Sequence, residues 1–269
     1  MKSALTVIKE HIKNFYLIRR LSAYEMKATN SSNYLGILWE IINPMIQISI
    51  YWLVFGFLMF NEGREVQGLP FFPWLLAGIV VWFFVNPATT QASKSIYSRL
   101  GMVSKMSFPM SVIPTYVIFA RLYQHLMLLG IAIVILAFIG YLPSMYIIQL
   151  PYFIIAAVVL LISFSLIVST LATIVRDVQM LVTSFVRILF YLTPILWFHE
   201  DLPQWIMTIM KANPLFYIVQ GYRASLVNGS WYIIENWEYT LYFWGAVIVL
   251  FLIGSSLHVK FRDRFADFM

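Results

Sequence analysis

Six long apolar runs alternate with short polar segments along this chain. The runs cover residues 41–60, 71–88, 108–139, 152–175, 180–198 and 239–259. A helix needs roughly 20 mostly apolar residues to cross about 30 Å of bilayer hydrocarbon. Inside lipid every backbone amide needs a partner within its own segment, and a helix supplies one. The pattern therefore predicts an all-α membrane protein with six transmembrane helices.

The N-terminal segment, residues 1–33, has helical spacing but too short an apolar run to span. Leu5, Ile8 and Ile12 fall on one helical face, and most of the lysines lie elsewhere. This pattern is typical of a basic amphipathic helix that lies in the cytoplasmic interface of a membrane. A simple orientation anchor is the alternative. We assign residues 34–262 to the transmembrane domain and residues 263–269 to a cytoplasmic tail.

The segment between the fifth and sixth runs is apolar in two pieces, 203–212 and 214–227, each too short to cross a bilayer. Asn213 followed by Pro214 is a helix start, with Asn as the N-cap and Pro in the first turn. We expect two short re-entrant helices on the external side.

Composition and charge agree with a membrane protein. The chain is 61% hydrophobic and 11% charged, with a net charge of +6 and no cysteine. Basic residues concentrate at the N-terminus, after the second and fourth runs, and at the C-terminus, which places both termini in the cytoplasm. The charges are scattered among membrane spans, so we expect contact with anionic lipid and no binding of nucleic acid.

No sequence pattern for catalysis is present. The chain contains no Gly-x-x-x-x-Gly-Lys-Ser/Thr phosphate loop and no His-Glu-x-x-His, and its four histidines are widely separated. Glu200 and Asp201 are adjacent and could bind a cation, but a solvated cap is the simpler interpretation. We therefore expect no catalytic residue, no metal site and no cofactor in this chain.

Two arginines lie within the apolar runs. Arg121 has Gln124 and His125 at i+3 and i+4, and Arg187 lies near Thr183 in the fifth run. A charged side chain at the bilayer centre costs at least about 2.5–3.5 kcal/mol, so it normally faces a partner, a cavity or a route. No acidic residue falls in the middle of any run. The pair therefore favours an anionic cargo, although Arg187 could snorkel to the interface and backbone carbonyls could hold Arg121.

Several short motifs follow one another along the chain: YLGILWEIINP at 34–44, SFP at 107–109, RDV at 176–178, TPI at 193–195, NPL at 213–215 and GYR at 221–223. Taken in order, they resemble the membrane subunit of the ABC-2 type polysaccharide exporters, and most closely the wall teichoic acid permeases of Gram-positive bacteria. Each motif is weak alone, but their order and spacing are specific.

The resemblance implies a homodimer in a bacterial plasma membrane, bound to two copies of a cytoplasmic ATPase that carries the ATP and magnesium. The implied cargo is wall teichoic acid on undecaprenyl pyrophosphate, moved from the inner to the outer leaflet. Capsular polysaccharide or O-antigen is the alternative cargo. A membrane glycosyl- or phosphotransferase, or an ion-driven carrier, would be a different class of protein.

The resemblance also gives roles to particular residues. The expected translocation path contains the two membrane arginines and nearby polar or aromatic side chains, the latter able to stack on sugar rings: Arg121, Gln124, His125, Thr183, Arg187, Tyr51 and Trp52. The expected ATPase contact contains residues of two predicted cytoplasmic loops: Ser98, Arg99, Leu100, Met102, Lys105, Arg176 and Asp177.

Overall fold

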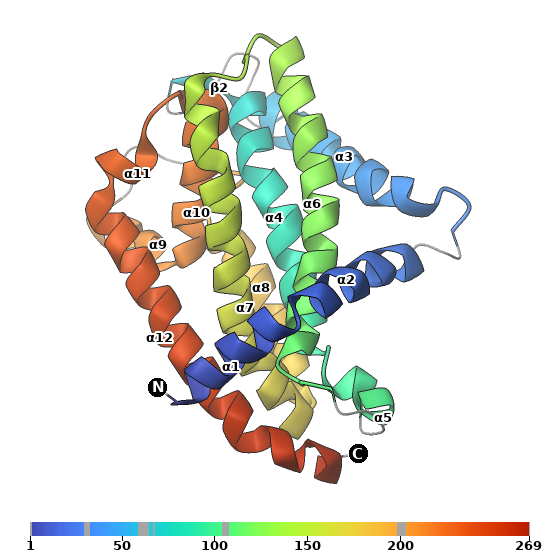
Figure 1. The fold of residues 1–269 in the computed structure, drawn as a ribbon. Coiled ribbons are helices and arrows are strands. Elements are labelled where there is room, and N and C mark those ends of the chain that lie inside the picture. The colour runs from blue at the N-terminus through green and yellow to red at the C-terminus, as the bar shows by residue number, and fades with distance from the viewer. Residues whose placement is uncertain are drawn as a thin grey trace.

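The computed structural model describes residues 2–29, 33–58, 65–66, 68–103, 108–197 and 203–268. These residues are mostly helical (Figure 1). The α-helices are α1 (Lys2–Lys13), α2 (Phe15–Thr29), α3 (Trp39–Tyr51), α4 (Phe71–Ser93), α5 (Leu100–Val103), α6 (Val112–Phe138), α7 (Leu150–Ile174), α8 (Asp177–Leu192), α9 (Gln204–Ala212), α10 (Pro214–Arg223), α11 (Tyr232–Glu235) and α12 (Trp237–Phe261).

Short elements connect the helices. The 3₁₀ segments are η1 (Gly36–Leu38), η3 (Tyr97–Arg99), η4 (Met145–Gln149) and η6 (Arg262–Phe268), and the π-helical segments are η2 (Trp52–Leu58) and η5 (Ala224–Asn228). β1 (Glu65–Val66) pairs antiparallel with β2 (Leu69–Pro70).

Within the described residues, five helical segments are long and apolar enough to cross a membrane. They are Gly36–Leu58, Phe71–Ser93, Val112–Phe138, Met145–Ile174 and Trp237–Phe265. Each contains or overlaps one of the predicted runs, so helices are confirmed at five of the six predicted spans.

The sixth predicted span, 180–198, is occupied by α8, which has 16 residues and ends at Leu192. At about 1.5 Å per residue this helix is about 24 Å long, short of the hydrocarbon thickness. The backbone of Thr193 is extended, because Pro194 disfavours a helical conformation in the residue before it. Residue 198 lies outside the described residues, and the count of six spans stays a prediction.

Helix α4 forms the centre of the bundle. In the segment Phe71–Ser93, 78% of an apolar stretch of 18 residues is buried. In Gly36–Leu58, only 6% of the corresponding stretch is buried. Helices α6, α7, α8 and α10 all pack against α4 (Figure 1). Residues 71–85 of α4 are all apolar, and a helical stretch that is apolar on every side belongs in such a position.

The segment between the fifth and sixth runs is helical as predicted, and its re-entrant path stays a prediction. Helices α9 and α10 occupy most of the two predicted apolar pieces. The N-cap is confirmed, because the Asn213 side chain accepts a hydrogen bond of 3.0 Å from the backbone N–H of Leu215. Helix α10 packs against α4, α7 and α12, inside the bundle.

Helices α1, α2 and α5 lie at the same end of the bundle as both chain termini, which we call the terminal end (Figure 1). Glu10 of α1 links this helix to η6 and to the start of α6. One of its carboxylate oxygens accepts a hydrogen bond of 2.7 Å from Arg262, and the other accepts one from Ser111.

His11 of α1 makes a second contact with α6 at the terminal end. Its Nε2 lies 2.6 Å from the Thr115 hydroxyl, and its Nδ1 lies 2.7 Å from the Val7 carbonyl oxygen. Burial lowers the pKa of His11, which favours the neutral ring. A neutral ring satisfies both contacts if Nδ1 donates to the carbonyl and Nε2 accepts from the hydroxyl.

The predicted apolar face of the N-terminal helix points away from the bundle. Leu5, Ile12 and Phe15 are 56%, 73% and 56% exposed, whereas Val7 and Ile18 are buried against the protein. An apolar face that the protein itself leaves uncovered is available to lipid, as an interfacial helix requires.

Gly254 in α12 permits the close packing of α7 and α12. A Cβ atom at this position would lie 2.9 Å from the Ser163 carbonyl oxygen and 3.0 Å from the Leu166 Cβ. Replacement by Leu should therefore force these helices apart, and overpacking of this kind typically costs about 1–3 kcal/mol. We expect Gly254→Leu to lower the thermal midpoint and the yield of monodisperse protein in detergent.

Gly245 provides the matched control for this prediction. It lies in the same helix, and a Cβ atom there would meet nothing within 4 Å. Gly245→Leu should leave the thermal midpoint close to that of the unmodified chain. Equal destabilisation by the two substitutions would contradict a packing role specific to Gly254.

Candidate functional site

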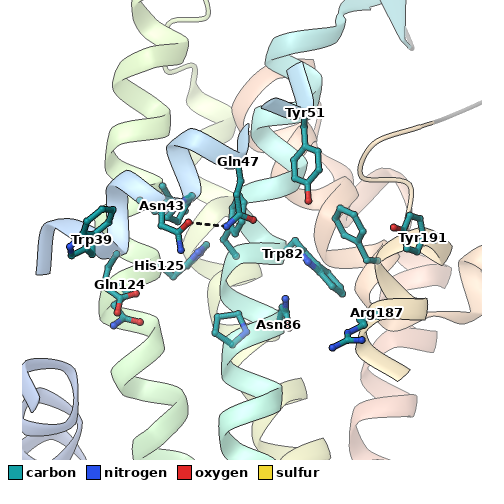
Figure 2. A pocket seen from close by; sticks show the side chains of 16 residues that line it. Trp39, Asn43, Gln47, Tyr51, Trp82, Asn86, Gln124, His125, Arg187 and Tyr191 are labelled. Carbon is teal, nitrogen blue, oxygen red and sulfur yellow. Dashed lines mark hydrogen bonds between the residues drawn. The ribbon is translucent and has the colours of Figure 1, made fainter. Parts of the chain in front are cut away.

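A cavity of about 440 Å³ opens between helices α3, α4, α6 and α8. We call it the membrane pocket, and Figure 2 shows the side chains that line it. All four helices contribute polar as well as aromatic side chains, which is unusual among apolar spans.

Helix α3 supplies one wall through a single face. Trp39, Asn43, Gln47 and Tyr51 recur every four residues and all line the pocket (Figure 2). The Gln47 amide donates a hydrogen bond of 3.1 Å to the Asn43 side-chain oxygen. This leaves further donors and acceptors of the two amides to face the cavity.

An aromatic cluster forms the wall between α4 and α8. The ring of Phe190 lies 5.0 Å from that of Trp82, 6.0 Å from that of Tyr51 and 5.4 Å from that of Tyr191, measured between centroids. Asn86 projects from α4 beside this cluster (Figure 2). The pocket thus combines flat apolar surfaces with side-chain amides.

Arg121 lies behind the pocket and organises its polar wall. Its Nη1 donates a hydrogen bond of 2.6 Å to the Gln124 side-chain oxygen and lies 3.4 Å from the nearer Glu40 oxygen. Its Nε donates a hydrogen bond of 2.7 Å to the side-chain oxygen of Gln91. The sequence pattern indicated no acidic partner for this arginine. The structure supplies one, because the start of α3 brings Glu40 against α6.

His125 connects the membrane pocket to α10. The ring stacks on Phe84, with 4.9 Å between centroids, and its Nε2 lies 2.8 Å from the Tyr222 hydroxyl. Both His125 and Tyr222 are buried. The wall of the pocket is therefore joined directly to the helix that follows Asn213.

Arg187 differs from Arg121 in its surroundings. Its side chain is exposed and lines the pocket from α8 (Figure 2). Among the described side chains, no carboxylate forms an ion pair with it. It is a cation facing the cavity.

Of the seven residues predicted for a path, Tyr51, Gln124, His125 and Arg187 line the membrane pocket. Arg121 supports Gln124 from behind. Thr183 and Trp52 do not line the cavity. The Thr183 hydroxyl donates a hydrogen bond to the Gln179 carbonyl oxygen, and the centre of the Trp52 ring lies 5.7 Å from that of Phe72.

Glu40, Asn43, Gln47 and Asn86 line the pocket and were missed. For Asn43 and Gln47, the four-residue spacing along α3 was the available signal.

A third arginine, Arg223, lies in the segment 214–227, which was predicted to be a re-entrant helix on the external side. It is fully buried at the end of α10. Its guanidinium lies 3.5 Å above the centre of the Trp74 ring, and its Nε donates a hydrogen bond of 3.2 Å to the Trp74 carbonyl oxygen. Gly78 makes room for this group, because a Cβ there would lie 2.6 Å from Nη2.

Three of the residues predicted to contact an ATPase, Ser98, Arg99 and Leu100, lie at the terminal end in η3 and α5 (Figure 1). Arg99 forms an ion pair with Glu25 of α2, and its guanidinium lies 5.5 Å from the centre of the Tyr116 ring. Leu100 is buried in a cluster with Ile18. Ser98 accepts a hydrogen bond of 3.3 Å from Arg99.

Arg176 and Asp177 form the tight connection between α7 and α8 and are exposed. Met102 lies in α5. Lys105 lies outside the described residues.

The sequence model of the ABC-2 type transporter family matches residues 16–227. The chain is also similar to the O-antigen export system permease protein RfbA of Klebsiella pneumoniae, with 29% identity over 258 residues that cover 95% of each chain. A protein of the same name from Myxococcus xanthus is 22% identical over 267 residues, which cover 98% of this chain and 99% of the relative.

The family match extends over well more than half of the chain and includes the helices that form the membrane pocket. Several apolar helices of membrane-spanning length agree with it. This protein therefore belongs to the ABC-2 type transporter family.

Proposed function

We propose that this chain is the membrane subunit of an ATP-driven exporter that moves a lipid-linked polysaccharide of the O-antigen type from the inner to the outer leaflet. Family membership implies a permease with a separate ATPase partner. The names of the relatives favour O-antigen over the wall teichoic acid that the sequence motifs suggested. The observation that carries the proposal is the amide- and aromatic-lined membrane pocket.

The chemistry of the pocket suits neutral sugars. Sugar hydroxyls both donate and accept hydrogen bonds, as do the amides of Asn43, Gln47 and Asn86. The rings of Trp82 and Tyr51 offer flat faces for the apolar side of a sugar ring.

The charges near the pocket are nearly balanced. Glu40 offsets Arg121, so only Arg187 is left as an uncompensated cation among the described pocket residues. A polyol phosphate carries a negative charge on every repeat and would call for more cations. The balance therefore supports a largely neutral polymer over teichoic acid.

A homodimer would complete the pocket. The helices that bound it, α3 and α8, bury few side chains in the single chain, and Met180, Leu181 and Ile188 of α8 are all more than half exposed. We propose that α3 and α8 meet their copies across a two-fold axis, so that two membrane pockets face one passage. In that arrangement Arg187 would face the passage from each side.

The terminal end is the proposed contact with the ATPase, which would bind ATP and magnesium. Basic residues concentrate there, as expected of the cytoplasmic side. The Arg99–Glu25 ion pair joins η3 to α2, so a push on this segment would be passed to the N-terminal helices.

The function can be tested by reconstituting the chain with its ATPase partner in vesicles. Lipid-linked polysaccharide in the inner leaflet should reach the outer leaflet only when both proteins and ATP are present. Transport by the chain alone under an ion gradient would contradict the proposal. Preferential transport of a polyol phosphate polymer would restore teichoic acid as the cargo.

Tyr51 and Trp52 provide a matched test of the passage. They are adjacent, but only Tyr51 lines the membrane pocket. We expect Tyr51→Ala to lower the rate of ATP-dependent export several-fold, because a stacking surface worth about 1 kcal/mol is lost. Trp52→Ala should have little effect on export at equal protein levels. Equal losses in the two variants would show that aromatic content alone matters.

The Arg99–Glu25 pair predicts a charge-reversal rescue. Arg99→Glu should place like charges together and reduce both ATPase co-purification and transport. The double variant with Glu25→Arg should restore a large part of both, because the pair is remade in the opposite sense. If the double variant behaves like Arg99→Glu, Arg99 contacts the ATPase directly. The measurement is the amount of ATPase retained per permease, together with the transport rate.

A further inference from the structure

A second polar cavity lies between α9, α10, η5 and α11, and shares no lining residue with the membrane pocket. We propose that this cavity, the outer pocket, binds a neutral sugar residue of the exported polysaccharide after it leaves the passage. The proposal rests on the proposed function. At about 400 Å³, the cavity lies within the range of roughly 300–1,000 Å³ that is typical of ligand sites.

The position of the outer pocket fits a role at the exit. α11 lies toward the end of the bundle away from both termini (Figure 1). With the termini in the cytoplasm, as the charge distribution predicts, the outer pocket opens on the external side. Helix α10 lies between α4 and the outer pocket and contributes residues to its wall.

Gln220 of α10 offers an amide to a polar ligand in this cavity. It lines the outer pocket, and the residue is only 8% exposed. Within the part of the chain that the structure describes, its side-chain amide has no hydrogen-bond partner. The amide atoms of Gln220 keep accessible surface toward the cavity, so they can bond a polar ligand that enters it.

The remaining lining is rich in groups that recognise hydroxyls. Asn228 and Asn236 add two further amides, and the half-buried ring of Tyr232 adds a flat wall. That ring is held by neighbours, since its centroid lies 5.7 Å from that of Tyr217 and 6.2 Å from that of Phe153. A fixed ring flanked by amides can stack on one face of a sugar while the amides bond its hydroxyls.

The charges of the outer pocket also favour a neutral ligand. One cation, Lys211, and one anion, Glu235, contribute to the lining. The Glu235 carboxylate accepts a hydrogen bond of 3.1 Å from the backbone N–H of Trp231, so it is fixed in place. A phosphate-rich polymer would meet this carboxylate as well as the lysine.

A site of this kind would bind the emerging polymer outside the passage. Weak binding of successive sugar residues at the exit would oppose backward sliding between strokes of the ATPase. The outer pocket is then part of the transport path without being part of the membrane pocket.

The test uses the complex of this chain with its ATPase in nanodiscs. Binding of maltotriose and mannotriose is measured by saturation-transfer difference NMR, with a glycerol phosphate trimer as the anionic probe. We expect at least one neutral trisaccharide to bind more tightly than the anionic probe. Gln220→Leu and, separately, Asn228→Ala should each weaken that binding about tenfold, as the loss of one or two hydrogen bonds predicts.

Gln204→Leu is the matched control, because Gln204 is an exposed amide at the start of α9 outside the outer pocket. It should leave binding unchanged. Asn228 is exposed, so its variant remains informative if Gln220→Leu fails to fold. Unchanged binding in both pocket variants, or tighter binding of the anionic probe, would overturn the proposal.

The outcome separates this inference from the proposed function. If the complex exports polysaccharide with ATP but both variants bind trisaccharide normally, only the outer pocket is wrong. If the reconstituted complex exports no polymer with ATP, the proposed function is wrong, whatever the probes do.

Discussion

The ion pair between Arg121 and Glu40 is the interaction on which the membrane pocket depends. Helix α3 contributes almost nothing to the buried core, and the pair joins it to α6 through a guanidinium that also holds Gln91 and Gln124. Two charges at membrane depth are tolerated only when each has a partner. By satisfying each other, they permit a polar wall between helices that are otherwise apolar.

Much of the helical layout was predictable, because the distance across a bilayer fixes how long an apolar run must be. The N-cap at Asn213 was predictable because its signal is local. The early end of α8 follows from Pro194, whereas the apolar run 180–198 continues through this residue. A run of apolar residues does not show where the backbone leaves the helix.

Contacts between distant residues were not predictable. Glu40 and Arg121 are 81 residues apart, and only the tilt and register of α3 bring them together. Arg223 lies in the predicted helix 214–227, but nothing near it in the sequence signals the complete burial of its side chain. Gln124 and His125 lie at i+3 and i+4 from Arg121, but only Gln124 interacts with it, by accepting a hydrogen bond from the guanidinium. His125 instead contacts Tyr222 of α10. Spacing along a helix shows which side chains are neighbours, but the packing of the other helices determines which of these neighbours interact.

The burial of Arg223 restricts how the bundle can move. Its guanidinium lies on the Trp74 ring and in the space left by Gly78, so α10 cannot separate from α4 without withdrawing a cation through tightly packed side chains. We therefore expect these two helices to stay together as one rigid unit. Any rearrangement of the bundle should involve the loosely held helices α3 and α8 instead.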